Sequence, residues 1–336
     1  MTGRTGRGDR IAGALLGVHA GDALGATLEF SPWTAIRARY PDGLRDIVGG
    51  GPFRWPAGHA TDDTDLTRAV LLAYLAPEGD DVVRAAADNM LAWLDGHWPG
   101  REPGAPPRDI GAATLHGLER YRRCGDPRAS GAGPGQAGNG SLMRCIPTAL
   151  AVADRARRIR ESAEISAITH DDQRAVAACA AYNEIAAALI TRTPPTEAIA
   201  LGLACARELG CTPVADAIVL GQRIRPETMA TTGNVPLHDQ GSGFVLDSLS
   251  LAVAAIVDPR PLADVLIDIV RIGNDTDTNA AIAGGLLGAR DGASAIPQRW
   301  RAPLQFGPEF AEAAAALARG TREGSRPERR HDDHGE

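Results

Sequence analysis

The sequence has few aromatic residues, no surplus of basic charge and no long apolar run. Aromatic residues make up 4% of the 336, so small aliphatic side chains must fill the core. The formal net charge is −7, which argues against generic nucleic-acid binding. The longest apolar stretches, such as residues 185–190, are far shorter than the ~20 residues of a membrane helix. We expect a cytoplasmic protein without membrane contact, working as a monomer.

Paired cysteines are also absent. No CxxC pair occurs, no histidine pattern accompanies the cysteines, and their number is odd. Such a set is typical of reduced, buried thiols and not of a disulfide framework or a zinc site. The five are Cys124, Cys145, Cys179, Cys205 and Cys211.

What the sequence does contain is helical periodicity. Ala- and Leu-rich segments with polar residues at helical spacing cover residues 11–28, 65–75, 82–94, 175–190, 196–209 and 244–257. Few segments combine β-branched residues with a period of two. We therefore predict an all-α fold with a single domain over residues 11–319. Residues 1–10 are expected to be a flexible N-terminus, and the charged residues 320–336 a disordered tail.

Two helical segments, the first one and a further one that begins after residue 279, carry unusually small residues. The first helix has a glycine at every fourth position, namely Gly13, Gly17, Gly21 and Gly25. The helix that follows residues 274–279 has Ala or Gly at positions 283–285 and 288. Each Gly inside a helix costs about 1 kcal/mol relative to Ala, so both surfaces predict close approach of a neighbour. On the first helix Asp22, Gly25 and Glu29 would share one face.

Two acidic clusters stand just before apolar helical runs, at residues 61–65 and 274–279. Thr, Asp and Asn are preferred helix N-caps, and acidic residues suit the positive end of the helix dipole. However, capping needs fewer carboxylates than these clusters contain, and a hard divalent cation would relieve their repulsion. Both interpretations, capping and metal binding, stay open from the residues alone. The metal interpretation makes best sense if the two ends of the chain meet.

A glycine-rich segment at residues 133–144 precedes another apolar run. Such a loop lets backbone amides approach a phosphate, although it matches neither a Walker A nor a dinucleotide-binding motif. Arg144 could pair with a phosphate or with a core carboxylate such as Asp22. His170 lies just before a helix, where a structural role and a ligand contact are both open.

Five short motifs, in one order along residues 11–290, together resemble the ADP-ribosylglycohydrolases. This family includes the dinitrogenase-reductase-activating glycohydrolase and the ADP-ribosylarginine and ADP-ribosylserine hydrolases. The motifs are Gly-Asp-Ala-Leu-Gly at 21–25 with Glu29, Thr-Asp-Asp-Thr at 61–64, Gly-Asn-Gly at 138–140 with Met143-Arg144, Thr169-His170, and Gly-Asn-Asp-Thr-Asp-Thr-Asn-Ala at 273–280. The resemblance implies a compact, orthogonal multi-helix domain.

The resemblance also implies a site with two Mg²⁺ or Mn²⁺ ions. Metal ligation is carried over to Thr61, Asp62, Asp63, Asp275, Asp277 and Thr278. Catalytic roles are carried over to Glu29, Asp63 and Asp275. Ligand contacts are carried over to Glu29, Gly135, Gly138, Asn139, Gly140, Ser141, His170 and Phe244.

The implied activity is hydrolysis of the glycosidic bond between ADP-ribose and a modified substrate, with ADP-ribosylarginine on protein as the first expectation. ADP-ribose or an ADP-ribosylated protein would be the partner. The alternatives are hydrolysis of ADP-ribosylserine, O-acetyl-ADP-ribose or ADP-ribosylated nucleic acid. An alternative of another class is a non-catalytic ADP-ribose binder or a crystallin-like protein.

One motif departs from the family pattern. Bacterial members often carry Asp-Ile-Gly-Asn before a Thr, whereas Ala112 follows Asp109, Ile110 and Gly111 here. Any role of that Asn is therefore lost. We expect Asp109 to be a helix N-cap, and a role in catalysis or substrate gating is the alternative.

Overall fold

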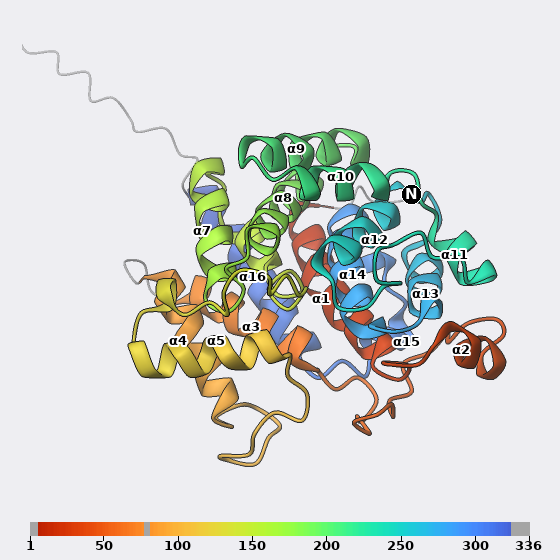
Figure 1. Cartoon of the computed structure of the whole chain (residues 1–336), viewed down its shortest axis with the longest axis horizontal. Helices are drawn as coiled ribbons and strands as arrows, with labels where there is room; N and C mark the ends of the chain where they lie inside the picture. The colour runs from red at the N-terminus through yellow and green to blue at the C-terminus, as the bar shows by residue number, and fades with distance from the viewer. Residues whose placement is uncertain (1–5, 77–80, 324–336) are drawn as a thin grey trace, which may run out of the picture.

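The computed structural model describes residues 6–76 and 81–323, which form sixteen α-helices and two short 3₁₀ turns (Figure 1). Within these ranges only isolated β-bridges occur, so the predicted all-α fold is confirmed. The first eight helices are α1 (Arg7–Gly25), α2 (Trp33–Arg39), α3 (Asp62–Leu75), α4 (Val82–Leu94), α5 (Ala112–Cys124), α6 (Ile146–Ala151), α7 (Arg155–Ala167) and α8 (Gln173–Ile190). The others are α9 (Pro195–Glu208), α10 (Thr212–Gly221), α11 (Pro226–Thr232), α12 (Val245–Val257), α13 (Leu262–Ile272), α14 (Thr276–Asp291), α15 (Gln298–Arg301) and α16 (Gly307–Glu323).

The helix ends differ from the predicted ones in several places; helix α3, for example, begins at Asp62 and not at residue 65. Helix α1 begins at Arg7, so residues 7–10 are helical and not a flexible segment. It ends at Gly25, which leaves Glu29 in the turn that follows and off the helical face predicted for it. Helix α16 runs to Glu323, four residues beyond the predicted domain end. The remaining parts of the two predicted terminal segments, residues 1–5 and 324–336, lie outside the described residues.

Helices α1 and α14 form the centre of the molecule, although they come from opposite ends of the chain (Figure 1). Their glycines face each other: a Cβ on Gly17 would overlap the backbone of Gly284, and one on Gly288 would overlap the backbone of Gly13. The two backbones can approach this closely only because these positions lack side chains. The predicted close approach is therefore confirmed, and each glycine-bearing helix is the neighbour of the other.

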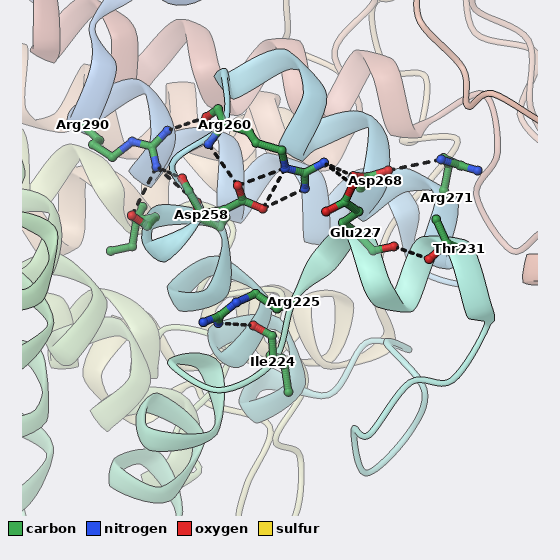
Figure 2. Close-up of polar contacts among 11 residues, drawn as sticks. Ile224, Arg225, Glu227, Thr231, Asp258, Arg260, Asp268, Arg271 and Arg290 are labelled. Carbon is green, nitrogen blue, oxygen red and sulfur yellow. Dashed lines mark hydrogen bonds and ion pairs between the residues drawn. The ribbon is translucent and has the colours of Figure 1, made fainter.

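A polar network fixes the helices that lead into α14 (Figure 2). Arg260 bridges Asp258, at the end of α12, to Asp268 on α13. Arg271 pairs with Asp268 as well, and Arg290 of α14 donates to the carbonyl of Asp258. Because Arg290 lies in the last turn of α14 and these groups are half-buried or buried, the network holds the C-terminal end of α14 against the end of α12 and the segment that leads into α13.

The apolar core is made largely of Ala, Leu, Ile and Val, as the scarcity of aromatics predicts. Cys145, Cys179, Cys205 and Cys211 are buried thiols, as expected. Cys124 is exposed at the end of α5, contrary to the prediction of burial. None of the helices in the described part of the chain is long and apolar enough to span a membrane.

Candidate active site

The two acidic clusters meet at the centre of the fold, where α3 and α14 both begin. Asp63 Oδ2 accepts hydrogen bonds from Thr61 Oγ1 at 3.2 Å and from Thr278 Oγ1 at 3.4 Å. Carboxylate oxygens of Asp22, Asp63 and Asp277 lie within 4.8 Å of one another. All of these side chains are buried, so the chain brings residues more than two hundred positions apart into one polar cluster.

Capping accounts for part of the first cluster. Thr61 is the N-cap of α3, and its hydroxyl accepts from the backbone N–H of Asp63. Asp22, on α1, adds a second cap from outside the helix: its Oδ2 accepts from the N–H groups of Thr61 and Thr64, and from the Thr64 hydroxyl. Asp22 therefore caps the start of a neighbouring helix. Its other oxygen, Oδ1, is buried with no hydrogen-bond partner.

Glu29 reaches the cluster through a strained turn. The Phe30 N–H donates to the Asn274 carbonyl at 2.8 Å, and the Asn274 N–H donates to the Ser31 carbonyl at 2.9 Å. Phe30 and Asn274 both have positive φ, 60° and 63°, which is uncommon for residues other than glycine. This pairing joins the segment after α1 to the start of α14 and places Glu29 within 4.8 Å of carboxylate oxygens of Asp109 and Asp277.

Asp109 is not a helix N-cap, and that prediction is wrong. Helix α5 begins at Ala112, and Gly111 occupies its N-cap position. The Pro- and Gly-rich loop before α5 turns the Asp109 side chain toward Glu29 and Asp277 instead. A lone Asp in a loop carries no periodicity, so only the family motif at this position could have placed it in the site.

Asp65, the third aspartate of the first cluster, lies apart from the others. Its two oxygens accept the indole N–H groups of Trp93 and Trp98, each at 2.8 Å. Because both oxygens are satisfied by these donors, Asp65 anchors the first turn of α3 and has no free oxygen for a cation. Asp65 is not among the predicted metal ligands.

The site concentrates negative charge in a buried place. Burial, followed by the nearby Asp109 and Asp275, raises the pKa of Glu29 to about 9. Burial and then Asp275 raise the pKa of Asp109 to about 6. Burial and neighbouring carboxylates also raise the pKa values of Asp62, Asp63 and Asp277 well above their usual range. Ionising all of these groups together is costly without a compensating positive charge.

The atoms present fit divalent cations. Four buried carboxylate oxygens have no hydrogen-bond donor, namely Asp22 Oδ1, Glu29 Oε2, Asp63 Oδ1 and Asp277 Oδ1. Buried polar atoms without a partner are rare and call for an explanation, such as an ion. The donor set is made only of oxygens, which hard ions such as Mg²⁺ and Mn²⁺ prefer. Capping alone therefore does not explain the clusters.

A cleft of about 540 Å³ opens over this cluster, within the size range of small-molecule sites. We call the part of the lining where carboxylate oxygens of Glu29, Asp109 and Asp277 lie within 4.8 Å of one another the acidic end, and the part where the glycine loop at Gly138 and Gly140 lies against the His170 ring the other end. Asn139 joins the two ends, because its Nδ2 donates to Asp275 Oδ2 at 2.7 Å. The acidic lining residues are Glu29, Asp62, Asp109, Asp275 and Asp277, and the lining side chains that the structure describes include no Lys or Arg.

Arg144 takes up neither of the two roles considered for it, a contact with a phosphate in the cleft or a pair with a core carboxylate such as Asp22. It is fully buried and donates to the carbonyls of Gly140 and Ile165 and to the Thr169 hydroxyl, so it contacts neither the cleft nor Asp22. It holds the glycine loop against the segment that carries His170. Burial and the nearby Arg144 charge lower the pKa of His170 to about 3, so this imidazole is neutral near pH 7.

Several predicted site residues do not line the cleft. Thr61 and Asp63 are buried in the carboxylate cluster. The Ser141 hydroxyl is buried and accepts from Ser166, and the Gly135 N–H donates to Asp172. Phe244 is the N-cap of α12, and its ring contacts His238 and Arg174 and not the cleft. The remaining predicted residues, Glu29, Asp62, Gly138, Asn139, Gly140, His170, Asp275, Asp277 and Thr278, do line it.

Residues 3–327 match the protein family described as ADP-ribosylglycohydrolase. The chain belongs to this family. It is 33% identical to the ADP-ribosylarginine hydrolase Tri1 of Pseudomonas putida (strain GB-1), over 87% of this chain and 73% of the relative. It is 31% identical to the ADP-ribosyl-[dinitrogen reductase] glycohydrolase of Rhodospirillum rubrum, over 89% of this chain and 91% of the relative.

A solved structure supports the fold of this ADP-ribosylglycohydrolase. A chain of an ADP-ribosylglycohydrolase-related protein complex superposes with a TM-score of 0.76 and 29% identity, covering 93% of this chain and 98% of the other. The family resemblance drawn from the motifs is thus confirmed, and with it the class of enzyme. The clustered aspartates of the ADP-ribosylglycohydrolase are buried where a metal could bind.

Proposed function

We propose that this ADP-ribosylglycohydrolase hydrolyses the bond between ADP-ribose and an arginine side chain of a modified protein, with two Mg²⁺ or Mn²⁺ ions. The observation that carries the proposal is the meeting of two sets of carboxylates, a buried one around Asp63 and a mostly buried one around Glu29, at one end of a cleft. Two relatives above 30% identity, whose names specify arginine and dinitrogen reductase, support a protein substrate.

The cleft suits one orientation of ADP-ribose. Its acidic end would take the distal ribose, because hydroxyl groups and cations are compatible with Glu29 and Asp277 whereas a phosphate is repelled by them. The pyrophosphate and adenosine would then extend toward Gly138, Gly140 and His170. Exposed backbone amides of a glycine loop suit a phosphate. A neutral His170 offers a ring for stacking or a hydrogen bond to the ligand.

When bound, the two cations would supply Lewis acidity, which lowers the pKa of a bound water molecule. Thr61, Asp62, Asp63, Asp275, Asp277 and Thr278 are the proposed ligands, and Asp22 adds a free buried oxygen to this set. Asn139 holds the Asp275 carboxylate toward the cleft. Asp63 is fully buried, whereas Glu29 lines the cleft, so Glu29 is the better placed of the two to take a proton from water.

The chemical step is a substitution at the anomeric carbon of the distal ribose. The water oxygen forms a bond to that carbon, and the carbon–nitrogen bond to the guanidinium group breaks. The electron pair of the broken bond goes to the departing nitrogen, and this nitrogen takes up a proton from the water. The products are free ADP-ribose and an unmodified arginine. Positive charge on the ribose in the transition state is stabilised by the surrounding carboxylates.

The test is a panel of defined substrates that share ADP-ribose and differ in the linkage: arginine, serine, O-acetyl and nucleic acid. We expect release of free ADP-ribose from arginine-modified protein with Mg²⁺ or Mn²⁺, and loss of release with EDTA. Preference for another linkage would replace the arginine assignment. Tight ADP-ribose binding without release in any divalent metal would identify a non-catalytic binder.

A further inference from the structure

A second cavity, of about 270 Å³, lies behind the carboxylates of the cleft. Asp62 and Asp109 line both cavities, so these two side chains form the boundary between them. If the distal ribose binds at the acidic end of the cleft, its anomeric substituent lies close to this boundary. The second cavity is therefore the nearest built space for the group that leaves.

The lining of the second cavity combines flat aromatic faces with acidic groups. Trp55 and His59 are stacked with their ring centroids 4.8 Å apart and an interplanar angle of 20°. Asp62, Asp109 and the exposed Glu102 supply carboxylates on the same lining. Aromatic faces and carboxylates together favour a planar cation, because the ring quadrupole and the negative charge both attract it.

The cavity already holds a guanidinium group that belongs to the chain. The Arg108 guanidinium carbon lies 5.6 Å from the centroid of the Trp55 ring, and Arg108 lines the cavity. Its side chain is exposed, and no hydrogen bond or ion pair within the described residues holds it. Arg101, by contrast, lies over Trp93 and is fixed by donating to the Trp93 and Ala105 carbonyls. Arg108 is thus a guanidinium that can be displaced.

We propose that the second cavity is the subsite for the arginine leaving group. The substrate guanidinium contacts the face of Trp55 beside Asp109, and the Arg108 side chain covers that face while no substrate is bound. This inference rests on the proposed function and adds a specificity determinant to it: a cationic, planar leaving group fits the cavity, whereas a serine hydroxyl gains nothing from Trp55.

The experiment measures binding of agmatine, a guanidinium on a short alkyl chain, by calorimetry with the full chain, Mg²⁺ and saturating ADP-ribose. Arg108→Ala removes the internal competitor and should lower the Kd of agmatine about threefold. Trp55→Ala should raise that Kd about tenfold, and Trp55→Phe, which keeps a flat ring and the fold, should raise it about twofold. Arg223→Ala, the same change at another exposed arginine, is the matched control and should leave the Kd unchanged.

Free ADP-ribose should bind all four variants within about twofold of the unmodified chain, because Trp55 and Arg108 do not line the cleft. Absence of agmatine binding, or an agmatine Kd that neither Arg108→Ala nor Trp55→Phe changes, would overturn the subsite. Failure of the proposed function looks different: agmatine and ADP-ribose bind as expected, yet arginine-modified protein releases no ADP-ribose.

Discussion

The Thr278 hydroxyl donates to Asp63 Oδ2 across 3.4 Å, and the two residues are 215 positions apart in the sequence. Thr278 lies in the first turn of α14 and Asp63 in the first turn of α3. Both helix N-termini therefore point their positive dipole ends at the same set of carboxylates. These dipoles offset part of the repulsion, and a pair of divalent cations would offset the remainder.

Asp275→Asn tests the metal-ligand assignment. An asparagine can still accept the hydrogen bond that Asn139 Nδ2 donates at 2.7 Å, so the local shape is kept while one negative charge is lost. We expect kcat/KM for ADP-ribose release to fall by about 100-fold or more, because loss of a ligand weakens the binding of the cation and the activation of its bound water. The helical circular dichroism spectrum should stay the same.

The matched control for that substitution is Asp264→Asn. Asp264 is on α13, half exposed and paired with Arg45 at the surface, so its change should leave turnover unaltered. Full turnover in the Asp275→Asn protein would show that Asp275 is not a ligand of a required metal.

The pKa shifts predict an unusual pH dependence for the metal-free protein. Burial and nearby carboxylates raise the pKa of Glu29 to about 9 in the folded state. A raised pKa means that the folded chain binds more protons than the unfolded one. The contribution of protonated Glu29 to the free energy of unfolding is therefore present at low pH and is lost as the pH rises toward 9. Between pH 6.5 and 9 Glu29 alone should lower the free energy of unfolding by about 1 kcal/mol per pH unit, and the raised pKa values of Asp62, Asp63 and Asp277 act in the same direction.

Thermal unfolding in EDTA and in Mg²⁺ or Mn²⁺ measures this dependence. Added cations should raise Tm, and the rise should grow with pH, because a cation binds the ionised carboxylates. Glu29→Gln is the control: its metal-free Tm should change less between pH 6.5 and 9. A metal-free Tm that climbs over this range in the unmodified chain would contradict the shifted pKa of Glu29.

His170→Ala tests whether the imidazole contacts the ligand. His170 lines the cleft beside Gly140, and its Nδ1 is hydrogen-bonded to the Thr169 hydroxyl at 2.8 Å. We expect the Kd of ADP-ribose to rise about tenfold while the Kd of Mn²⁺ stays within about twofold. Because the pKa of His170 is lowered to about 3, the binding contribution should not vary between pH 5.5 and 8.

His116→Ala is the matched control, since His116 is an exposed histidine on α5 outside the cleft. It should leave the Kd of ADP-ribose unchanged. Equal affinities for ADP-ribose and metal in the His170→Ala and unmodified proteins would assign His170 a purely structural role.

The parts of the site that could be predicted are those with local signals. Thr61 and Asp275 stand at helix starts, where cap residues precede apolar periodicity, and the presence of both helices is confirmed, although each begins inside its acidic cluster and not after it. The glycine stripe beginning at Gly13 also has a helical period, so close packing could be predicted from it. These signals depend on neighbours within a few turns and need no knowledge of the tertiary fold.

The parts that could not be predicted depend on distant contacts. Asp109 reaches the cluster through an irregular loop, and Glu29 through a turn that Asn274 holds from the far end of the chain. The resemblance implies a ligand contact for Ser141, and the sequence leaves Arg144 open between a phosphate and a core carboxylate. Both side chains turn into the core, where Ser166 and Thr169 are their partners. A glycine-rich loop has no period from which to infer which side chains face inward.

The contact between α1 and α14 yields the last prediction, because it positions both halves of the site. A Cβ on Gly17 would overlap the backbone of Gly284, and neither helix can move without shifting its neighbours. We expect Gly17→Ala to lower the free energy of unfolding in urea by about 3 kcal/mol, at the upper end of overpacking costs. The shift of α14 relative to α3 should also weaken Mn²⁺ binding. Gly8→Ala is the control on the same helix, since its Cβ would lie 3.6 Å from Ala318 Cβ, an ordinary contact, and should stabilise slightly. Equal stability of the Gly17→Ala and Gly8→Ala proteins would contradict the close packing of these two helices.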